Sequence, residues 1–118
     1  MNVTIMTENG EIIVDNDVIA KCAGAAACEC FGIVGMASIN VRDGLAKLLK
    51  VENLANGVNV KVEDNKLRID LHIIVSYGVN IPSVCENLRE TVKYKVEECT
   101  GLDVVTVNIY VDGVRVID

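Results

Sequence analysis

The chain has 118 residues, a net charge of −6, an apolar share of 51% and only 3% aromatic residues. This length suits a single domain, residues 1–118, with a core of aliphatic side chains. The acidic balance argues against nucleic acid as a partner, because phosphate binding needs a basic surface, and against direct docking on an anionic membrane. We see no signal peptide and no apolar run of the roughly 20 residues that a spanning helix needs, so we expect a cytoplasmic protein without direct membrane insertion.

The first third of the chain predicts a hairpin and then a helix. Val3 to Thr7 and Glu11 to Val14 flank Asn9-Gly10, a pair typical of two-residue hairpin turns. Polar residues at 15–17 offer an N-cap for a helix that ends near Gly32. The predicted buried face of this helix consists of Val18, Ile19, Cys22, Ala23, Ala26, Ala27 and Cys30.

The segment after this helix contains two candidate binding features. Gly32-Ile33-Val34-Gly35 resembles the GxxG loop of KH RNA-binding modules, but it lacks their basic neighbours, so RNA binding here is a minor alternative to a simple turn. Residues 36–41 predict a short strand, and residues 42–50 predict a short helix. On this helix Arg42, Lys47 and Lys50 form a positive cluster, which we take as a candidate surface for an acidic partner.

Two alternating stretches, 58–63 and 66–76, predict a long central hairpin. A turn at Asp64-Asn65 places all their apolar residues on one face, so burial fixes the register. The other face sets Lys61 opposite Arg68, a mild cost unless an acidic group intervenes. The apolar pairs are Val62 with Leu67, Val60 with Ile69 and Val58 with Leu71.

The hexapeptide Tyr77-Gly78-Val79-Asn80-Ile81-Pro82 joins this hairpin to a second helix. Its glycine and proline suit the turn and the first helical positions. Tyr77 and Asn80 are candidates to face a partner, or else they cap and pack. The helix ends at Gly101, and its predicted apolar stripe consists of Ile81, Val84, Cys85, Leu88, Val92, Val96 and Cys99.

A last strand, with Val105, Val107, Ile109 and Val111 alternating, precedes a turn at Asp112-Gly113 from which residues 114–117 pair back as a short hairpin. Strands joined through a helix within one sheet run parallel, whereas the hairpin is antiparallel, so the sheet should be mixed. We therefore expect an α+β fold: a single two-layer domain, a mixed sheet with a long central hairpin, and two main helices plus one short helix packed mainly on one face. The opposite face is the default place for a partner.

The cysteines and the single histidine give a weak chemical signal. An odd count of five cysteines suits a reducing compartment, and Cys28-Glu29-Cys30 lacks the spacing of a zinc knuckle. We expect the other four cysteines on apolar helix faces and Cys28 exposed. His72 has no nucleophile and carboxylate beside it in the sequence, so we interpret it as a surface or packed residue. We expect no cofactor and no metal; a small-ligand or metal site using Cys28, Cys30 or His72 is the alternative.

Blocks along nearly the whole chain, about residues 8–115, resemble the alkaline shock protein family. The resemblance implies a non-enzymatic cytoplasmic protein of Gram-positive bacteria, linked to cell-envelope or alkaline stress, with no catalytic residues to carry over. It further implies homo-oligomers and docking on a membrane-anchored protein partner. The first block consists of Glu11-Ile12-Ile13-Val14, Val18-Ile19, Ala23-Gly24-Ala25-Ala26 and Gly32-Ile33-Val34-Gly35-Met36, and the second of the hexapeptide with Ser83-Val84, Thr100-Gly101-Leu102, Val107-Asn108 and Gly113-Val114.

Overall fold

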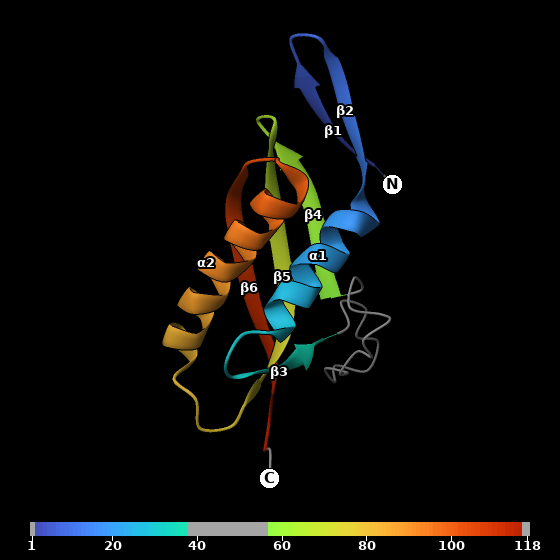
Figure 1. Ribbon diagram of the computed structural model, residues 1–118. Helices are drawn as coiled ribbons and strands as arrows, with labels where there is room; N and C mark the ends of the chain where they lie inside the picture. The colour runs from blue at the N-terminus through green and yellow to red at the C-terminus, as the bar shows by residue number, and fades with distance from the viewer. Residues whose placement is uncertain (1, 38–56, 117–118) are drawn as a thin grey trace.

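A computed structural model describes residues 2–37 and 57–116 of the chain (Figure 1). The expected helix at 42–50 lies outside these residues, as does most of the strand expected at 36–41. The elements in chain order are β1 (Asn2–Thr7), β2 (Gly10–Asp15), α1 (Asn16–Cys28), β3 (Ile33–Met36), β4 (Val58–Glu63), β5 (Lys66–Ser76), α2 (Ile81–Thr100) and β6 (Val104–Arg115).

β5 is the central strand of a four-stranded mixed sheet. β4 and β3 pair with it antiparallel, and β6 pairs with it parallel after the crossover through α2. The β4–β5 register is the expected one, with Val62 opposite Leu67 and Lys61 opposite Arg68. Asp64 and Asn65 form the turn with φ of 50° and 65°, the left-handed conformation that two-residue hairpin turns require. The mixed sheet with a central hairpin is confirmed.

β6 differs from the sequence prediction at both ends. It is one continuous strand of 12 residues, so the expected hairpin after Asp112-Gly113 is wrong. Its pairing with β5 shifts twice, which leaves Val105 and Asp112 as extra residues in two irregularities of the ladder. β-bulges of this kind keep a strand paired while adding a residue, and a glycine after the second one tolerates the distorted backbone. The last residues of β6 therefore stay paired with the long β5, although Asp112-Gly113 by itself would favour a turn.

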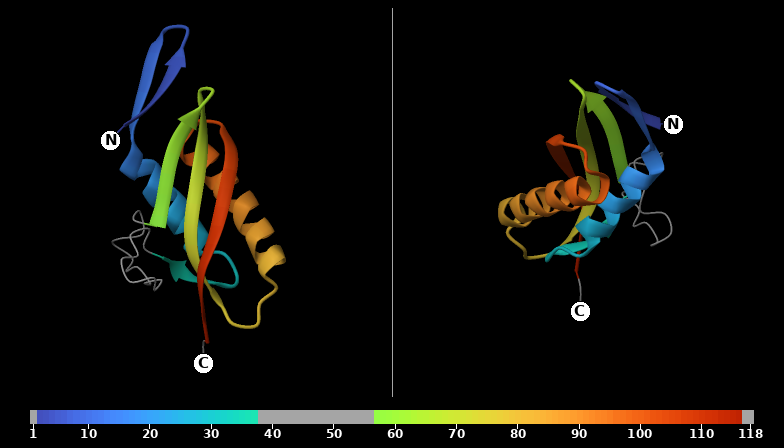
Figure 2. Two further views of the ribbon diagram at one scale, coloured as in Figure 1. Left: turned by 180° about the vertical axis from the view of Figure 1, so that it is seen from behind. Right: turned by 45° about the horizontal axis from the view of Figure 1, so that its top comes forward.

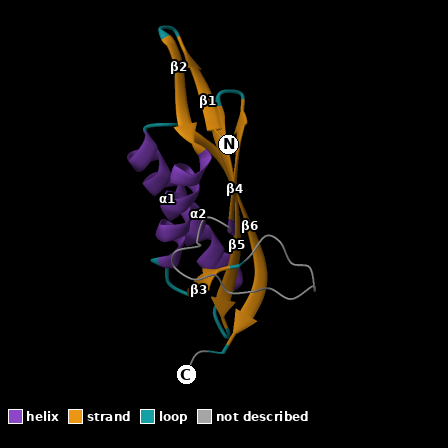
Figure 3. Ribbon diagram, turned by 90° about the vertical axis from the view of Figure 1, so that its right-hand side faces the viewer, coloured by secondary structure: helices purple, strands orange, loops and turns teal. Residues whose placement is uncertain are grey.

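Both helices lie on the same face of the four-stranded sheet, which makes the two layers visible in Figures 2 and 3. This confirms the expected α+β fold. The helix starts are capped as the sequence suggests: Asp15 accepts a hydrogen bond from the backbone N–H of Asp17 at 2.9 Å, and Asn80 accepts one from Ser83 at 3.0 Å. Gly101 ends α2 with a left-handed φ of 73°.

The core lies between the two layers. The inward side chains of β5 pack in one cluster with the apolar stripe of α2 and the alanine-rich face of α1. The small side chains of α1 let this helix approach α2 and the sheet closely. α1 ends at Cys28, before the expected Gly32, and Val18 is exposed rather than buried, because the buried face of α1 centres on Ile19, Ala23 and Ala27.

β1 and β2 form a separate two-stranded sheet that projects beyond the end of the larger sheet (Figure 1). The pairing of Thr7 with Gly10 places the turn at Glu8 and Asn9, one residue earlier than expected. A two-stranded hairpin alone is only marginally stable in water. Here its inward side chains Val3 and Ile5 are buried in the core cluster.

Candidate interaction surface

The face of the sheet opposite the helices carries the polar side chains of the central strands. In the part of the chain that the structure describes, no helix lies on this face (Figure 2, left). We call it the open face; its side chains include Arg68, Asp70 and His72 of β5 and Asn108 and Tyr110 of β6, which the strand register places side by side. It is the face that the sequence suggested for a partner.

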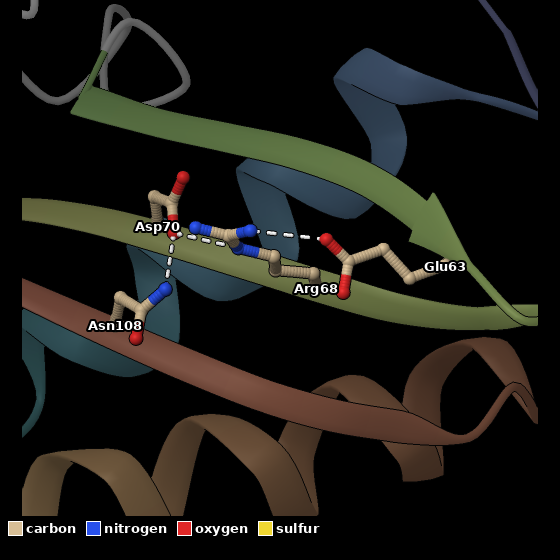
Figure 4. A network of polar contacts seen from close by, with 4 residues as sticks. All are labelled: Glu63, Arg68, Asp70 and Asn108. Carbon is tan, nitrogen blue, oxygen red and sulfur yellow. Dashed lines mark hydrogen bonds and ion pairs between the residues drawn. The ribbon is translucent and has the colours of Figure 1, made fainter.

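A chain of polar contacts runs across the open face (Figure 4). Arg68 Nη1 donates a hydrogen bond to Glu63 Oε1 at 3.0 Å, and Asn108 Nδ2 donates one to Asp70 Oδ1 at 3.0 Å. Arg68 Nε lies 3.6 Å from Asp70 Oδ1, an ion pair longer than a hydrogen bond. The acidic groups therefore offset the repulsion expected between Arg68 and Lys61. The hydrogen bond to Glu63 and the charge of Asp70 raise the pKa of Arg68, which stays positively charged.

Asp70 is the buried charged side chain of the described residues, with 7% of its surface exposed. A buried carboxylate is tolerated when hydrogen bonds and opposite charges surround it. Asn108 and Arg68 supply these partners from two neighbouring strands. The network therefore fixes both the side-chain geometry of the open face and the pairing of β5 with β6.

His72 also has partners that the sequence does not reveal. Its Nδ1 lies 2.7 Å from Asp112 Oδ2, and its ring stacks on Tyr110 with 4.7 Å between ring centroids. Asp112 is the extra residue of the second bulge in β6, so strict alternation would not place it beside His72. The histidine is packed, as expected, but with a carboxylate neighbour. The signal in the sequence was Asp112-Gly113, which we interpreted as a turn.

A second exposed feature lies at the end of the molecule where α1 turns into β3. Phe31, the only phenylalanine of the sequence, is 80% exposed. It contributes to two shallow hollows of about 380 and 260 Å³. Val79 lines the first and Asn80 the second, so this aromatic side chain adjoins the hexapeptide. The sequence alone marks Phe31 only as a residue near the end of a helix.

The expected partner residues are distributed differently. Tyr77 is exposed, and its backbone N–H donates to the carbonyl of Arg115 at 2.7 Å. The side chain of Asn80 caps α2, which supports its structural role. The positive cluster of Arg42, Lys47 and Lys50 lies outside the described residues. A role for these five residues in binding a partner stays a prediction.

The residues of the alternative metal or ligand site do not converge. Cys30 is buried in the core, Cys28 is exposed at the end of α1, and His72 lies on the open face. Within residues 2–37 and 57–116, no three His, Cys, Asp or Glu side chains gather as metal ligands would. The KH-like reading of Gly32 to Gly35 is also wrong in its geometry, because Ile33–Met36 is a strand hydrogen-bonded to β5 rather than a loop between two helices.

Three of the thiols have a pKa above the ordinary value of a cysteine. Burial raises the pKa of Cys22 to about 11, with a further contribution from its hydrogen bond with Cys99. Partial desolvation also raises the pKa of Cys85 and that of Cys28, although Cys28 as a whole residue is exposed. Because the thiolate is the reactive form, a raised pKa makes these three side chains less reactive near neutral pH. Cys99 is exposed, contrary to its expected place on the apolar stripe of α2, whose buried residues are Val84, Leu88, Val92 and Val96.

Fold and surface together define a small α+β domain with a helical layer on one side and a polar, hydrogen-bonded sheet face on the other. No helix among the described residues is long and apolar enough to cross a membrane. The chain belongs to the alkaline shock protein 23 family, which is described by a cell envelope-related function and whose model matches residues 4–116. The resemblance seen in the sequence is therefore confirmed.

Relatives cover the chain almost completely. An uncharacterized protein of Bacillus subtilis (strain 168), YloU, is 50% identical over 117 residues, which span 98% of each chain. An uncharacterized protein of Streptococcus pyogenes serotype M6 is 42% identical over 118 residues, 99% of this chain and 98% of the relative. A protein of Streptococcus pyogenes serotype M3 named stress response regulator gls24 homolog is 30% identical over 109 residues, 90% of this chain but 59% of that protein. No solved structure matches the chain.

Proposed function

We propose that this protein is a non-enzymatic cytoplasmic interaction protein in the response to cell-envelope stress or in envelope homeostasis. It self-associates and docks on a membrane-anchored protein partner, which brings it to the membrane. The observation that carries this proposal is the open face, where ordered polar side chains surround an exposed aromatic ring. The family description and the relative named as a stress response regulator support the cellular setting.

The open face suits a protein partner for physical reasons. Its side chains are already held by hydrogen bonds and ion pairs, so binding costs little additional side-chain entropy. Tyr110 is stacked on His72 and 44% exposed, and tyrosine is enriched at the centres of interfaces. Charges of both signs in a fixed pattern select a partner by electrostatic complementarity.

A photo-crosslinking residue in place of Tyr110 tests the proposal in cells under envelope stress. Tyr94 is the matched control, because it is also an exposed tyrosine, 62% exposed, but it lies on α2 in the other layer. We expect crosslinks from position 110 to further copies of this chain and to a protein with a transmembrane segment. Position 94 should give few of these products.

Two results would contradict the proposal. The first is equal crosslinking from positions 110 and 94, which would mean that the open face has no special role. The second is a strict monomer in light scattering at all concentrations, together with no membrane-anchored protein among the crosslinked products.

A further inference from the structure

None of the described strands lies beside the outer edge of β6. Among the described residues, β6 pairs with β5 alone, so a 12-residue strand presents one free row of backbone N–H and C=O groups. The two irregularities at Val105 and Asp112 lie near its ends, which leaves Thr106 to Val111 in regular register. Such an edge is a template for another extended chain.

Helix α2 turns this edge into a groove. In Figure 1 and in the reverse view of Figure 2, the N-terminal half of α2 extends past β6 on the side away from β5. The groove between them has a volume of about 370 Å³. Pro82, Cys85 and Arg89 line it from the helix, and Val107 and Ile109 line it from the strand.

We propose that this groove binds an extended segment of a partner protein, which pairs with β6 as an additional strand. Alternate side chains of the segment point under α2, onto Pro82, Cys85 and Ile109, so these positions are apolar and of moderate size. Glu86 and Arg89 at the rim form an ion pair with each other. The chain as a whole has a net charge of −6, so the segment is basic overall.

A second copy of the chain fits this edge poorly. Adjacent strands lie about 4.8 Å apart. A β6 strand from another copy would bring its own α2, about 10 Å in diameter, to the place that α2 already occupies. The overhanging helix therefore leaves room for one strand without a helix behind it, which is why an extended segment is the occupant.

The inference rests on the proposed docking function and names the place and the chemistry of one partner contact. The probe is a synthetic peptide selected from a library of short displayed peptides for binding to the intact chain, and fluorescence anisotropy measures its affinity. Cys85→Arg fills the groove, whereas Cys28→Arg places the same charge on exposed α1. We expect Cys85→Arg to weaken binding roughly tenfold or more and Cys28→Arg to leave it unchanged.

A second measurement leaves the protein unaltered. In a bound strand, the backbone N–H groups at alternate positions point toward β6 and those in between point away from it. N-methylation of the first set should weaken binding roughly tenfold, whereas N-methylation of the second set should have little effect. NMR shifts of the amides of Thr106 to Val111 should accompany binding. These two readouts decide the question even if Cys85→Arg does not fold.

Three results would overturn the inference: no peptide binds, both methylated sets bind like the parent peptide, or Cys85→Arg abolishes a dimer of this chain instead of peptide binding. Each of these leaves the proposed function standing if position 110 still crosslinks to a membrane-anchored protein. Loss of the position-110 crosslinks with retained peptide binding would instead contradict the role of the open face.

Discussion

The side chain of Asn65 pairs with the backbone of Met6 as another strand residue would. Its Nδ2 donates to the Met6 carbonyl at 2.8 Å, and its Oδ1 accepts from the Met6 N–H at 2.8 Å. Asn65 lies in the β4–β5 turn and Met6 in β1, 59 positions apart in the sequence. The two hydrogen bonds tie the projecting β1–β2 hairpin to the larger sheet.

Replacing Asn65 with glycine should loosen this hairpin. Asn65→Gly retains the left-handed backbone (φ 65°) but removes both hydrogen bonds to Met6. We expect the free energy of unfolding to fall by about 1–2 kcal/mol and the amide of Met6 to exchange with solvent much faster. Asp64→Gly is the control in the same turn (φ 50°). If the amide hydrogen of Met6 exchanged equally fast in both variants, the hydrogen bonds of Asn65 would not be what holds the hairpin to the larger sheet.

Asp70 should be the most sensitive position of the open face. In Asp70→Ala the amide of Asn108 loses its acceptor in a partly buried place, so we expect a loss of about 1–3 kcal/mol in the free energy of unfolding. Asp70→Asn keeps an acceptor and should lose less. Glu63→Ala removes an exposed partner of Arg68 and should have little effect. Urea unfolding measures all three, and a neutral Asp70→Ala would show that the network does not stabilise the sheet.

The sequence predicts what alternation and capping determine locally. The β4–β5 register follows from two apolar sets that one face must bury together, and the structure has it as expected. Asp15, Asn80 and Gly101 occupy the cap positions for which their side chains or backbone are suited. The parallel pairing of β5 with β6 follows from the crossover through α2.

The contacts across β5 and β6 could not be predicted, because they depend on two irregularities in the ladder. Each adds one residue to β6 and reverses the alternation, so Val105 is exposed and Asp112 reaches His72. The exposure of Phe31 follows from where α1 ends, four residues before the glycine that seemed to end it. A bulge adds a residue that the alternation of apolar and polar residues does not mark.

The stability of the fold should fall in alkaline solution, in part because of Cys22. Burial raises its pKa from 9.0 to about 11, so the unfolded chain loses this proton at a lower pH than the folded chain does. The folded state therefore holds more protons between pH 9 and pH 11, and the free energy of unfolding declines as the pH rises through this range. In Cys22→Ser this part of the decline should disappear.

Thermal unfolding at several pH values measures the effect. Cys99→Ala is an informative companion, because it removes the hydrogen-bonding neighbour that helps to raise the pKa of Cys22. Alkylation with iodoacetamide gives an independent readout: at pH 8 the folded Cys22 should react roughly tenfold more slowly than the same thiol in urea, because its smaller thiolate fraction is only partly offset by the higher nucleophilicity of a more basic thiolate. Equal rates in the folded and the unfolded chain would contradict the raised pKa.

Gly32 should tolerate alanine less well than Gly101, although both have a left-handed backbone. The φ angles are 84° and 73°, so each substitution costs about 1–2 kcal/mol in backbone strain. A Cβ at Gly32 would also lie 2.8 Å from Cγ2 of Val84, a short, buried side chain of α2, whereas a Cβ at Gly101 meets no atom within 4 Å. We therefore expect Gly32→Ala to lose about 1–3 kcal/mol more in urea unfolding. The double variant with Val84→Ala separates the two causes: the clash predicts that Gly32→Ala costs less when Val84 is already alanine, whereas additive losses would leave backbone strain as the whole explanation.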